Sequence, residues 1–272
     1  MTRIPQFALA VSVLLTSHVL ADELASTGRQ LLSQHSNSVL TVECQLRQSV
    51  TAGAQEQTSE SKTTVCGTVL NGAGLLAVSL TAVDPSTYLK ATNPQARALN
   101  IQVEVVSVKI VLPEGAEVPA EIVYRDKDLD LAFVRAKEAL PKTVTPVLFQ
   151  KGLKPMVLDD VFVIWRYGPL ASRTLGIDTG RIMGLVSKPR PYYLADVTQM
   201  PGAASCPVFS AAGKPLGLIL FRFDSGGATA GAMTVVIPAD DILEDIQQIA
   251  EASPKPPEPA PAVTPAPEQK KP

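Results

Sequence analysis

Apolar residues that alternate with polar ones dominate this chain and constrain its fold more than any other feature. The alternation is present in SVLTVECQLR, TTVCGTVLN and LDLAFVRA in the first half, and in VFVIWRYG and GAMTVVIP in the second. Successive side chains of a β-strand point to opposite faces, so this period predicts half-buried strands. The stretch LPKTVTPVLFQKGLKPMVLDD breaks the period. Two sets of roughly six strands, joined by that stretch, are therefore expected.

Short strands separated by turns predict an all-β fold of two six-stranded antiparallel barrels packed side by side. A pair of β-sandwiches is the alternative architecture. We expect the first barrel at about residues 38–137 and the second at about residues 156–238. Helical spacing is convincing only at residues 24–34 and in PADDILEDIQQIAEA. The latter predicts a short closing helix at residues 239–251.

The two ends of the chain differ in composition from its body. Residues 1–21 combine a short cationic start, an apolar run and the sequence VLA before an aspartate, which predicts a cleaved signal peptide. Residues 253–272 are rich in Pro and Ala and predict a disordered tail. The folded domain should span residues 22–252, be periplasmic or secreted, and have no membrane span after signal cleavage.

Composition excludes several classes of function. The chain has 24 Lys and Arg against 26 Asp and Glu, without a basic cluster in its body, so nucleic acid is not expected as a partner. Its two histidines, His18 and His35, have no cluster of metal ligands around them. We expect no metal and no cofactor.

Three cysteines in an exported chain predict one disulfide and one remaining thiol. Cys44 and Cys66 lie on consecutive predicted strands and form one possible pair. The alternation weakens this pairing, because Cys44 is in register with apolar neighbours whereas Cys66 is in register with Thr64 and Thr68. Cys206 is the third cysteine.

In its order of segments, the chain resembles the trypsin-like peptidase domain of the HtrA/DegP family from about residue 39 to residue 249. The resemblance rests on CGTVLNGAGLLAVSLTAV, on DLDLAFVRA, on RIMGLVS, on PGAASCP followed by AAGKPLGLI, and on MTVVIPADDILEDIQQI. These segments are similar to those that carry the family's catalytic histidine, aspartate and serine, its following hairpin and its closing helix. We expect no PDZ-like domain after it.

The resemblance places Ala82 at the catalytic histidine, Asp130 at the aspartate and Ala204 at the nucleophile. It places the oxyanion-hole amides at Gly202 and Ala204. A serine nucleophile needs a positioned base, and neither histidine of this chain falls near the site. Asp130 is then expected to accept hydrogen bonds from backbone N–H groups in the turn around Thr81 and Ala82.

Two residues of the same loop offer alternative nucleophiles. Ser205 follows the expected position by one residue, and Cys206 would act as a thiolate if its pKa were lowered. The family geometry also brings the Cys66 strand close to this loop, so it implies a Cys66–Cys206 disulfide as the alternative to Cys44–Cys66.

The resemblance therefore implies a degenerate protease, or pseudoprotease, that binds an extended peptide or a partner protein without cleaving it. The peptide would add as a strand beside residues that the family places at its groove, which are Leu218, Ile219, Leu220, Phe221, Arg222 and Phe223. The alternatives are an active HtrA-like serine endopeptidase that uses Ser205 or Cys206, and a structural module whose groove is filled by its own side chains. The sequence does not predict an oligomeric state.

Overall fold

The computed structural model describes residues 23–52, 55–86, 89, 99–197, 202–223 and 232–252. The predicted signal peptide at residues 1–21, His18, and the predicted tail at residues 253–272 lie outside these residues. None of the helices within the described residues is long and apolar enough to cross a membrane.

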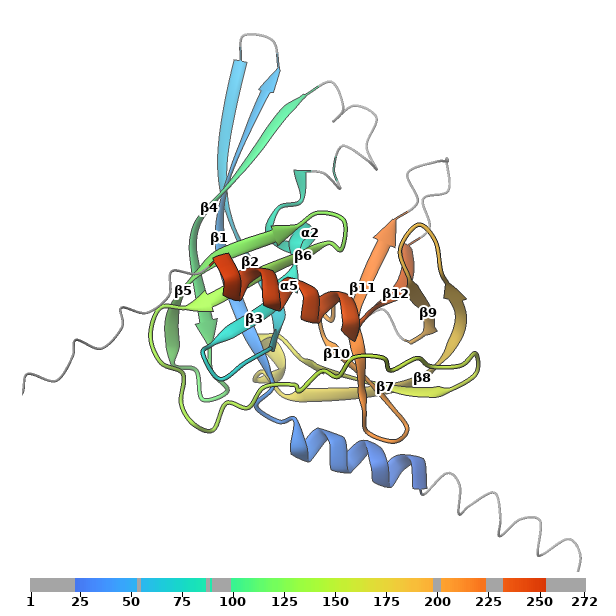
Figure 1. Ribbon diagram of the computed structural model, residues 1–272. Coiled ribbons are helices and arrows are strands. Elements are labelled where there is room, and N and C mark those ends of the chain that lie inside the picture. Colours follow the sequence, from blue (N-terminus) through green and yellow to red (C-terminus); the bar gives the residue numbers. More distant parts are fainter. Residues whose placement is uncertain are drawn as a thin grey trace, which may run out of the picture.

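The first half of the chain closes into an antiparallel barrel (Figure 1). The alternation of apolar side chains places one face of each strand inside, as the sequence predicts. Its strands are β1 (Val39–Ala52), β2 (Gln55–Val69), β3 (Leu75–Ser79), β4 (Asn100–Val111), β5 (Glu117–Asp126) and β6 (Leu131–Ala136). The order around the barrel is β1-β2-β3-β6-β5-β4.

The second half closes into another barrel with the order β10-β11-β12-β9-β8-β7. Its strands are β7 (Asp160–Arg166), β8 (Leu175–Val186), β9 (Tyr192–Asp196), β10 (Pro207–Ser210), β11 (Pro215–Phe223) and β12 (Ala232–Pro238). Two closed six-stranded antiparallel barrels confirm the predicted fold class. The β-sandwich alternative is wrong because both sheets close on themselves.

Helices occupy the ends of the domain and two of its loops. A helix at residues 23–34 packs under the second barrel, and α5 (Ala239–Ala252) ends the described chain. The short helix α2 (Leu80–Val83) and the 3-10 turn η1 (Pro169–Ala171) lie in loops. Figure 1 shows α5 lying across the junction of the two barrels.

Three clusters of buried side chains hold the molecule together. One fills the first barrel around Leu76 and Ile110. A second fills the second barrel around Phe162 and Phe209, and also takes in Leu31 of the N-terminal helix. The third joins the barrels beneath α5, and its members from both halves include Leu131, Phe133, Leu218, Leu220 and Ile242. The two barrels therefore share a continuous apolar interface.

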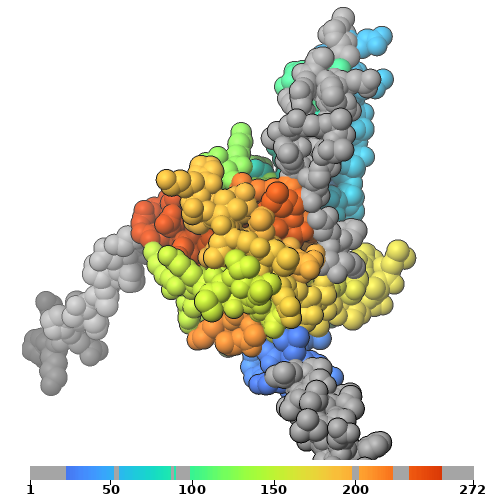
Figure 2. Space-filling model, turned by 90° about the vertical axis from the view of Figure 1, so that its right-hand side faces the viewer, coloured from blue at the N-terminus to red at the C-terminus, as the bar shows by residue number. Residues whose placement is uncertain are grey.

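The outer ends of β1, β2 and β4 extend beyond the first barrel as an arm (Figures 1 and 2). The β2 residues of this arm are exposed from Gln55 to Lys62. Arg47 in β1 bridges the neighbouring strands through Glu60 at 3.0 Å and Glu104 at 3.2 Å. Polar side chains on the outer strand are typical of a protected sheet edge.

Candidate functional site

The positions assigned to a catalytic triad come from three segments that meet at the barrel junction. Ala82 lies on α2, Asp130 lies in the turn before β6, and Ala204 lies in the turn before β10. Leu129 and Leu131, on either side of Asp130, belong to the apolar cluster beneath α5 against which Ala204 also packs. The chain therefore brings these three positions to one region.

Asp130 is held by the segment that carries Ala82. Its Oδ1 accepts hydrogen bonds from the Thr81 amide at 2.8 Å and the Thr81 hydroxyl at 2.7 Å. Its Oδ2 accepts a hydrogen bond from the Ser79 hydroxyl at 3.1 Å. Ser79 also caps α2, since its Oγ accepts from the Ala82 amide at 3.3 Å. Asp130 thus has the structural role expected for it in the turn around Ala82.

Burial raises the pKa of Asp130 above its usual value, and the three hydrogen bonds from Thr81 and Ser79 oppose that rise. The backbone of Asp130 is in the left-handed region, with φ of 59°. That conformation is uncommon for a non-glycine residue, and Asp is one of the residues that tolerate it. The sequence indicated the turn at Thr81 but not Ser79 as a partner, although a Ser before a short helix is a recognisable capping signal.

The loop before β10 turns Ser205 into the protein. Ser205 has φ of 66° and its side chain is fully buried. Its hydroxyl donates to the Cys66 carbonyl at 3.0 Å and also contacts the Ala204 carbonyl. Its own carbonyl accepts from the Thr68 hydroxyl at 2.5 Å. The Ser205 oxygen therefore ties β2 to the loop and is not presented at the surface as a nucleophile would be.

The two predicted oxyanion-hole positions remain close to this turn. Gly202 is exposed with φ of 87°, which suits a glycine, and Ala204 is half-buried. The next two amides are engaged, since Ser205 donates to Ile219 at 2.7 Å and Cys206 donates to Ala203 at 3.1 Å. Among the described residues, neither the Gly202 amide nor the Ala204 amide donates to a backbone carbonyl.

Cys206 does not have the environment of a reactive thiolate. Its side chain is fully buried, and that burial, followed by its contact with the Cys66 sulfur, raises its pKa well above the usual value. The hydrogen bond between the Cys206 and Cys66 sulfurs lowers the pKa of Cys66. The Cys66 sulfur also lies 3.2 Å from the Arg166 carbonyl and 3.4 Å from the Arg166 amide.

The prediction of a Cys44–Cys66 disulfide, one of the two alternatives, is wrong. Cys44 lies opposite Thr63 and Cys66 lies opposite Thr41, so the two cysteines are three positions apart on paired strands and face opposite sides. Cys44 fills the first barrel, where burial raises its pKa to about 12. Cys66 faces the core of the second barrel. All three cysteines are free thiols in this structure.

His35 contacts other parts of the described chain, and the three donors to Asp130 come from Ser79 and Thr81. Its ring packs 4.5 Å from the Phe209 ring, and its Nδ1 lies 3.3 Å from the Ser38 hydroxyl. Burial lowers its pKa.

The predicted peptide groove requires correction at its first three residues. The side chains of Leu218, Ile219 and Leu220 are 0–1% exposed and belong to the apolar cores, so they cannot line an open groove. Phe221 and Arg222 are half-buried, and the side chain of Phe223 lies outside the described residues.

Within the described residues, the backbone of β11 nevertheless has an unpaired edge at Phe221. Both backbone groups of Ile219 bond away from β12, to Cys206 at 2.9 Å and to Ser205 at 2.7 Å. Backbone direction repeats every two residues in a strand, so the N–H and C=O of Phe221 point the same way. The β10 pairing ends at Leu218, and the described residues supply no ladder partner for Phe221 on that side.

Arg222 reaches from β11 to the first barrel. Its Nη2 donates to the Asp128 carbonyl at 2.8 Å, and its guanidinium carbon lies 5.2 Å from the centre of the Tyr192 ring. Its positive charge also acts on Asp130 and opposes the rise in the pKa of that carboxyl. This contact across the junction was not indicated by the sequence.

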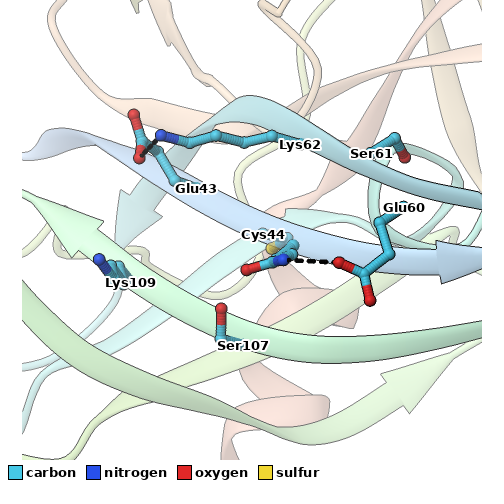
Figure 3. Close-up of a pocket in the computed structure, with 8 residues that line it drawn as sticks. Glu43, Cys44, Glu60, Ser61, Lys62, Ser107 and Lys109 are labelled. Carbon is cyan, nitrogen blue, oxygen red and sulfur yellow. Dashed lines mark hydrogen bonds and ion pairs between the residues drawn. The ribbon is translucent and has the colours of Figure 1, made fainter.

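A surface pocket of about 360 Å³ lies against β1, β2 and β4, away from these residues (Figure 3). Its charges are already matched, because Lys62 pairs with Glu43 at 2.5 Å and Lys109 pairs with Glu117 at 2.5 Å. Figure 3 shows the Lys62–Glu43 pair along one side of the pocket. Among the described residues, no group of three or more His, Cys, Asp or Glu is arranged to hold a metal ion.

Two closed antiparallel barrels, with the junction loops brought together as described, define the class of trypsin-like folds. The sequence profile of the trypsin-like peptidase domain matches residues 66–218, which is more than half of the chain. The chain therefore belongs to the trypsin-like peptidase domain family. A comparison with curated proteins gives no match.

Proposed function

We propose that this chain is an exported, non-catalytic member of the trypsin-like family, related to HtrA/DegP proteins. In this proposal it binds an extended segment of a partner protein along the open edge of β11. Residues Ala82 and Ala204 stand at the positions of the base and the nucleophile, and Asp130 serves only to hold α2.

The orientation of Ser205 is the observation that carries the proposal. A serine nucleophile must reach its substrate and pass its proton to a base. The Ser205 hydroxyl is fully buried and donates to the Cys66 carbonyl at 3.0 Å, while Asp130 is occupied by Ser79 and Thr81. Cys206 is equally buried, with a raised pKa. These features argue against the endopeptidase alternative.

The open edge at Phe221 supports peptide binding. An added strand gains main-chain hydrogen bonds from such an edge, whatever its side chains are. Phe221 and Arg222 are half-buried beside it and would contribute selectivity.

A structural module is the second candidate, and the Arg222 contact favours it. Arg222 already bridges β11 to the Asp128 carbonyl at 2.8 Å. If this bridge closes the approach to Phe221, no peptide is needed and the fold serves as a scaffold.

Activity-based labelling tests the loss of catalysis. The mature chain from Asp22 onward should show no labelling by a fluorophosphonate or by iodoacetamide under native conditions, and no cleavage of casein. Cys44, Cys66 and Cys206 are buried, so native thiol labelling should be absent as well. Labelling or cleavage that disappears in Ser205→Ala or Cys206→Ala would identify a nucleophile and overturn the proposal.

Selection from a displayed peptide library tests the binding edge. We expect selected peptides to bind wild type and Phe221→Leu, but to lose at least tenfold in affinity for Phe221→Pro, because proline removes the outward N–H without removing a bond to β12. Equal binding by all three proteins would show that the edge is not used. If no peptide is selected by wild type but peptides are selected by Arg222→Ala, the structural module is correct.

A further inference from the structure

A cavity of about 420 Å³ lies between the turn after β5 and α5, and no residue of β11 lines it. Its lining is almost entirely polar. Five acidic and three basic side chains line it, and these are Asp126, Asp128, Asp241, Glu244 and Asp245 with Arg125, Lys127 and Arg190. A volume of this size is within the range of cavities that hold ligands.

Two carboxylates on one face of α5 line the cavity, and one oxygen of each has no hydrogen-bond donor among the described residues. Asp241 and Asp245 are one helical turn apart, which places them side by side on the helix. The Oδ2 atom of each is buried and has no hydrogen-bond partner among the described residues. Asp245 as a whole is only 3% exposed. A buried acceptor without a donor is unfavourable and requires an explanation.

The cations that line the cavity, Arg125, Lys127 and Arg190, do not supply the missing donors, since neither Oδ2 atom has a hydrogen-bond partner among the described residues. Arg190 lies 3.9 Å from Asp126 Oδ2, and its side chain is about half exposed. Asp126 Oδ1 is used by the backbone, since it accepts from the Asp128 amide at 2.7 Å and the Leu129 amide at 2.8 Å. Tyr124 directs its hydroxyl to Gln248 at 3.2 Å. The polar groups of the opposite wall are thus engaged with one another and give no donor to the Oδ2 atoms of Asp241 and Asp245.

We propose that this cavity binds the guanidinium group of an arginine side chain from a partner protein, between Asp241 and Asp245. A guanidinium offers only donors, in a planar fork that can serve two carboxylates at once. A metal ion fits less well, because the carboxylates of the described residues are not arranged as metal ligands. Arg222 of β11 donates to the carbonyl of Asp128 on the cavity wall, but no residue of β11 lines the cavity, so either proposal can fail alone.

The charged side chains of the cavity predict how the binding of arginine depends on pH. Burial raises the pKa of Asp245 to about 7, with Asp126, Asp241 and Glu244 adding repulsion and Arg190 opposing it. Asp245 must be ionised to bind a cation. Binding should therefore strengthen as the pH rises through about 7, and a bound guanidinium should lower the pKa of Asp245.

Titration with acetyl-Gly-Arg-Gly-amide, followed by NMR of carboxyl-labelled aspartate, tests the site directly. The neutral peptide in which citrulline replaces arginine is the matched control. At pH 8.5 the arginine peptide should shift the Asp241 and Asp245 signals saturably, at least tenfold more tightly than the citrulline peptide and than itself at pH 5.5. Asp245→Asn and Asp241→Asn should each weaken binding at least tenfold, whereas Glu251→Gln, farther along α5, should not.

Three results would overturn the proposal. The first is equal binding of the two peptides, and the second is unchanged affinity in Asp245→Asn. The third is that Arg190 itself fills the cavity. In that case wild type binds neither peptide, whereas Arg190→Gln binds the arginine peptide.

Discussion

Asp130 and Asp245 are both carboxylates removed from water, yet their surroundings differ. Asp130 has three donors within 3.1 Å, whereas one oxygen of Asp245 has none among the described residues. Hydrogen bonds to the charged form favour ionisation, and burial without them opposes it. The result is a structural carboxylate at the position that the resemblance assigns to the triad and a titrating one on α5.

Replacing Asp245 with asparagine should stabilise the protein at high pH. The folded-state pKa of about 7 lies above the ordinary Asp value of 3.8, so between about pH 4 and pH 7 the folded state holds a proton that the unfolded state releases. The free energy of unfolding therefore falls as the pH rises through this window. Asn does not titrate, so Asp245→Asn should gain on the order of 3 kcal/mol at pH 8 relative to pH 4.

Urea unfolding at pH values from 4 to 8 measures this difference. Asp240→Asn, which changes a neighbouring carboxyl whose Oδ1 accepts from the Gly152 amide at 2.8 Å, is the control for a general change of charge. Parallel stability curves for wild type and Asp245→Asn would show that Asp245 titrates normally.

At the scale of elements, two glycines let strands approach more closely than a side chain would permit. A Cβ on Gly217 in β11 would lie 1.8 Å from the Ile237 carbonyl oxygen of β12. A Cβ on Gly180 in β8 would lie equally close to the Asp196 carbonyl oxygen. Backbone atoms cannot move aside as a flexible side chain can, so these positions set the spacing of the second barrel.

Gly217→Ala should therefore destabilise the protein by about 3 kcal/mol or more, since the β11–β12 pair must separate locally. Gly72→Ala is the matched control, because a Cβ there meets nothing within 4 Å and the residue has no positive φ. We expect it to change stability by less than about 0.5 kcal/mol. Thermal unfolding of both variants measures the contrast, and similar melting temperatures would contradict the close approach.

The strands were predictable from the sequence, because the alternation of apolar and polar residues shows which face of each strand is buried. The same reasoning separated Cys44 from Cys66, which do face opposite sides. It failed for Leu218, Ile219 and Leu220, because the strand that carries them is buried on both faces between the second barrel and the junction. Such a strand has a continuous apolar run, which looks the same whether or not it borders a groove.

The site was less predictable than the fold. The resemblance identified the positions of Ala82 and Ala204, but the inward turn of Ser205 depends on its positive φ, which the sequence does not reveal. Asp241 and Asp245 read as the polar face of an amphipathic helix. The packing of α5 against the turn after β5 buries Asp245 and leaves Asp241 half-buried.

At the scale of the whole molecule, the barrels are joined by polar contacts as well as by the apolar interface. Arg166 at the end of β7 donates to the carbonyls of Val39 at 2.8 Å, Arg173 at 2.8 Å and Ser36 at 2.6 Å. Two of these acceptors lie at the entry to the first barrel. The buried guanidinium thus fixes the start of β1 against the second barrel.

Arg166→Met should destabilise the protein by about 3 kcal/mol, because it leaves the three carbonyls without their donor. Arg181→Met removes an exposed ion pair with Asp160 and should change stability by less than about 1 kcal/mol. Chemical unfolding of the two variants gives both values, and equal effects would show that Arg166 is not a structural link.

Cys66 and Cys206 form a second link between the barrels, and we predict that they become a disulfide when the protein folds under oxidising conditions. Cys66 belongs to β2 and Cys206 precedes β10, and the two thiols are in contact within a buried cluster. Joining them with oxidised glutathione releases two molecules of the reduced form. Closing a loop of about 140 residues should stabilise the protein by about 2–5 kcal/mol.

Refolding from denaturant with oxidised glutathione is the appropriate test, because both thiols are buried in the folded protein. Non-reducing peptide mapping should recover Cys66 linked to Cys206 and Cys44 as a free thiol. Dithiothreitol should lower the melting temperature of wild type and Cys44→Ser, but not of Cys66→Ser or Cys206→Ser. Three free thiols after refolding would contradict the prediction, and would leave the contact between the barrels to Arg166 and the apolar interface alone.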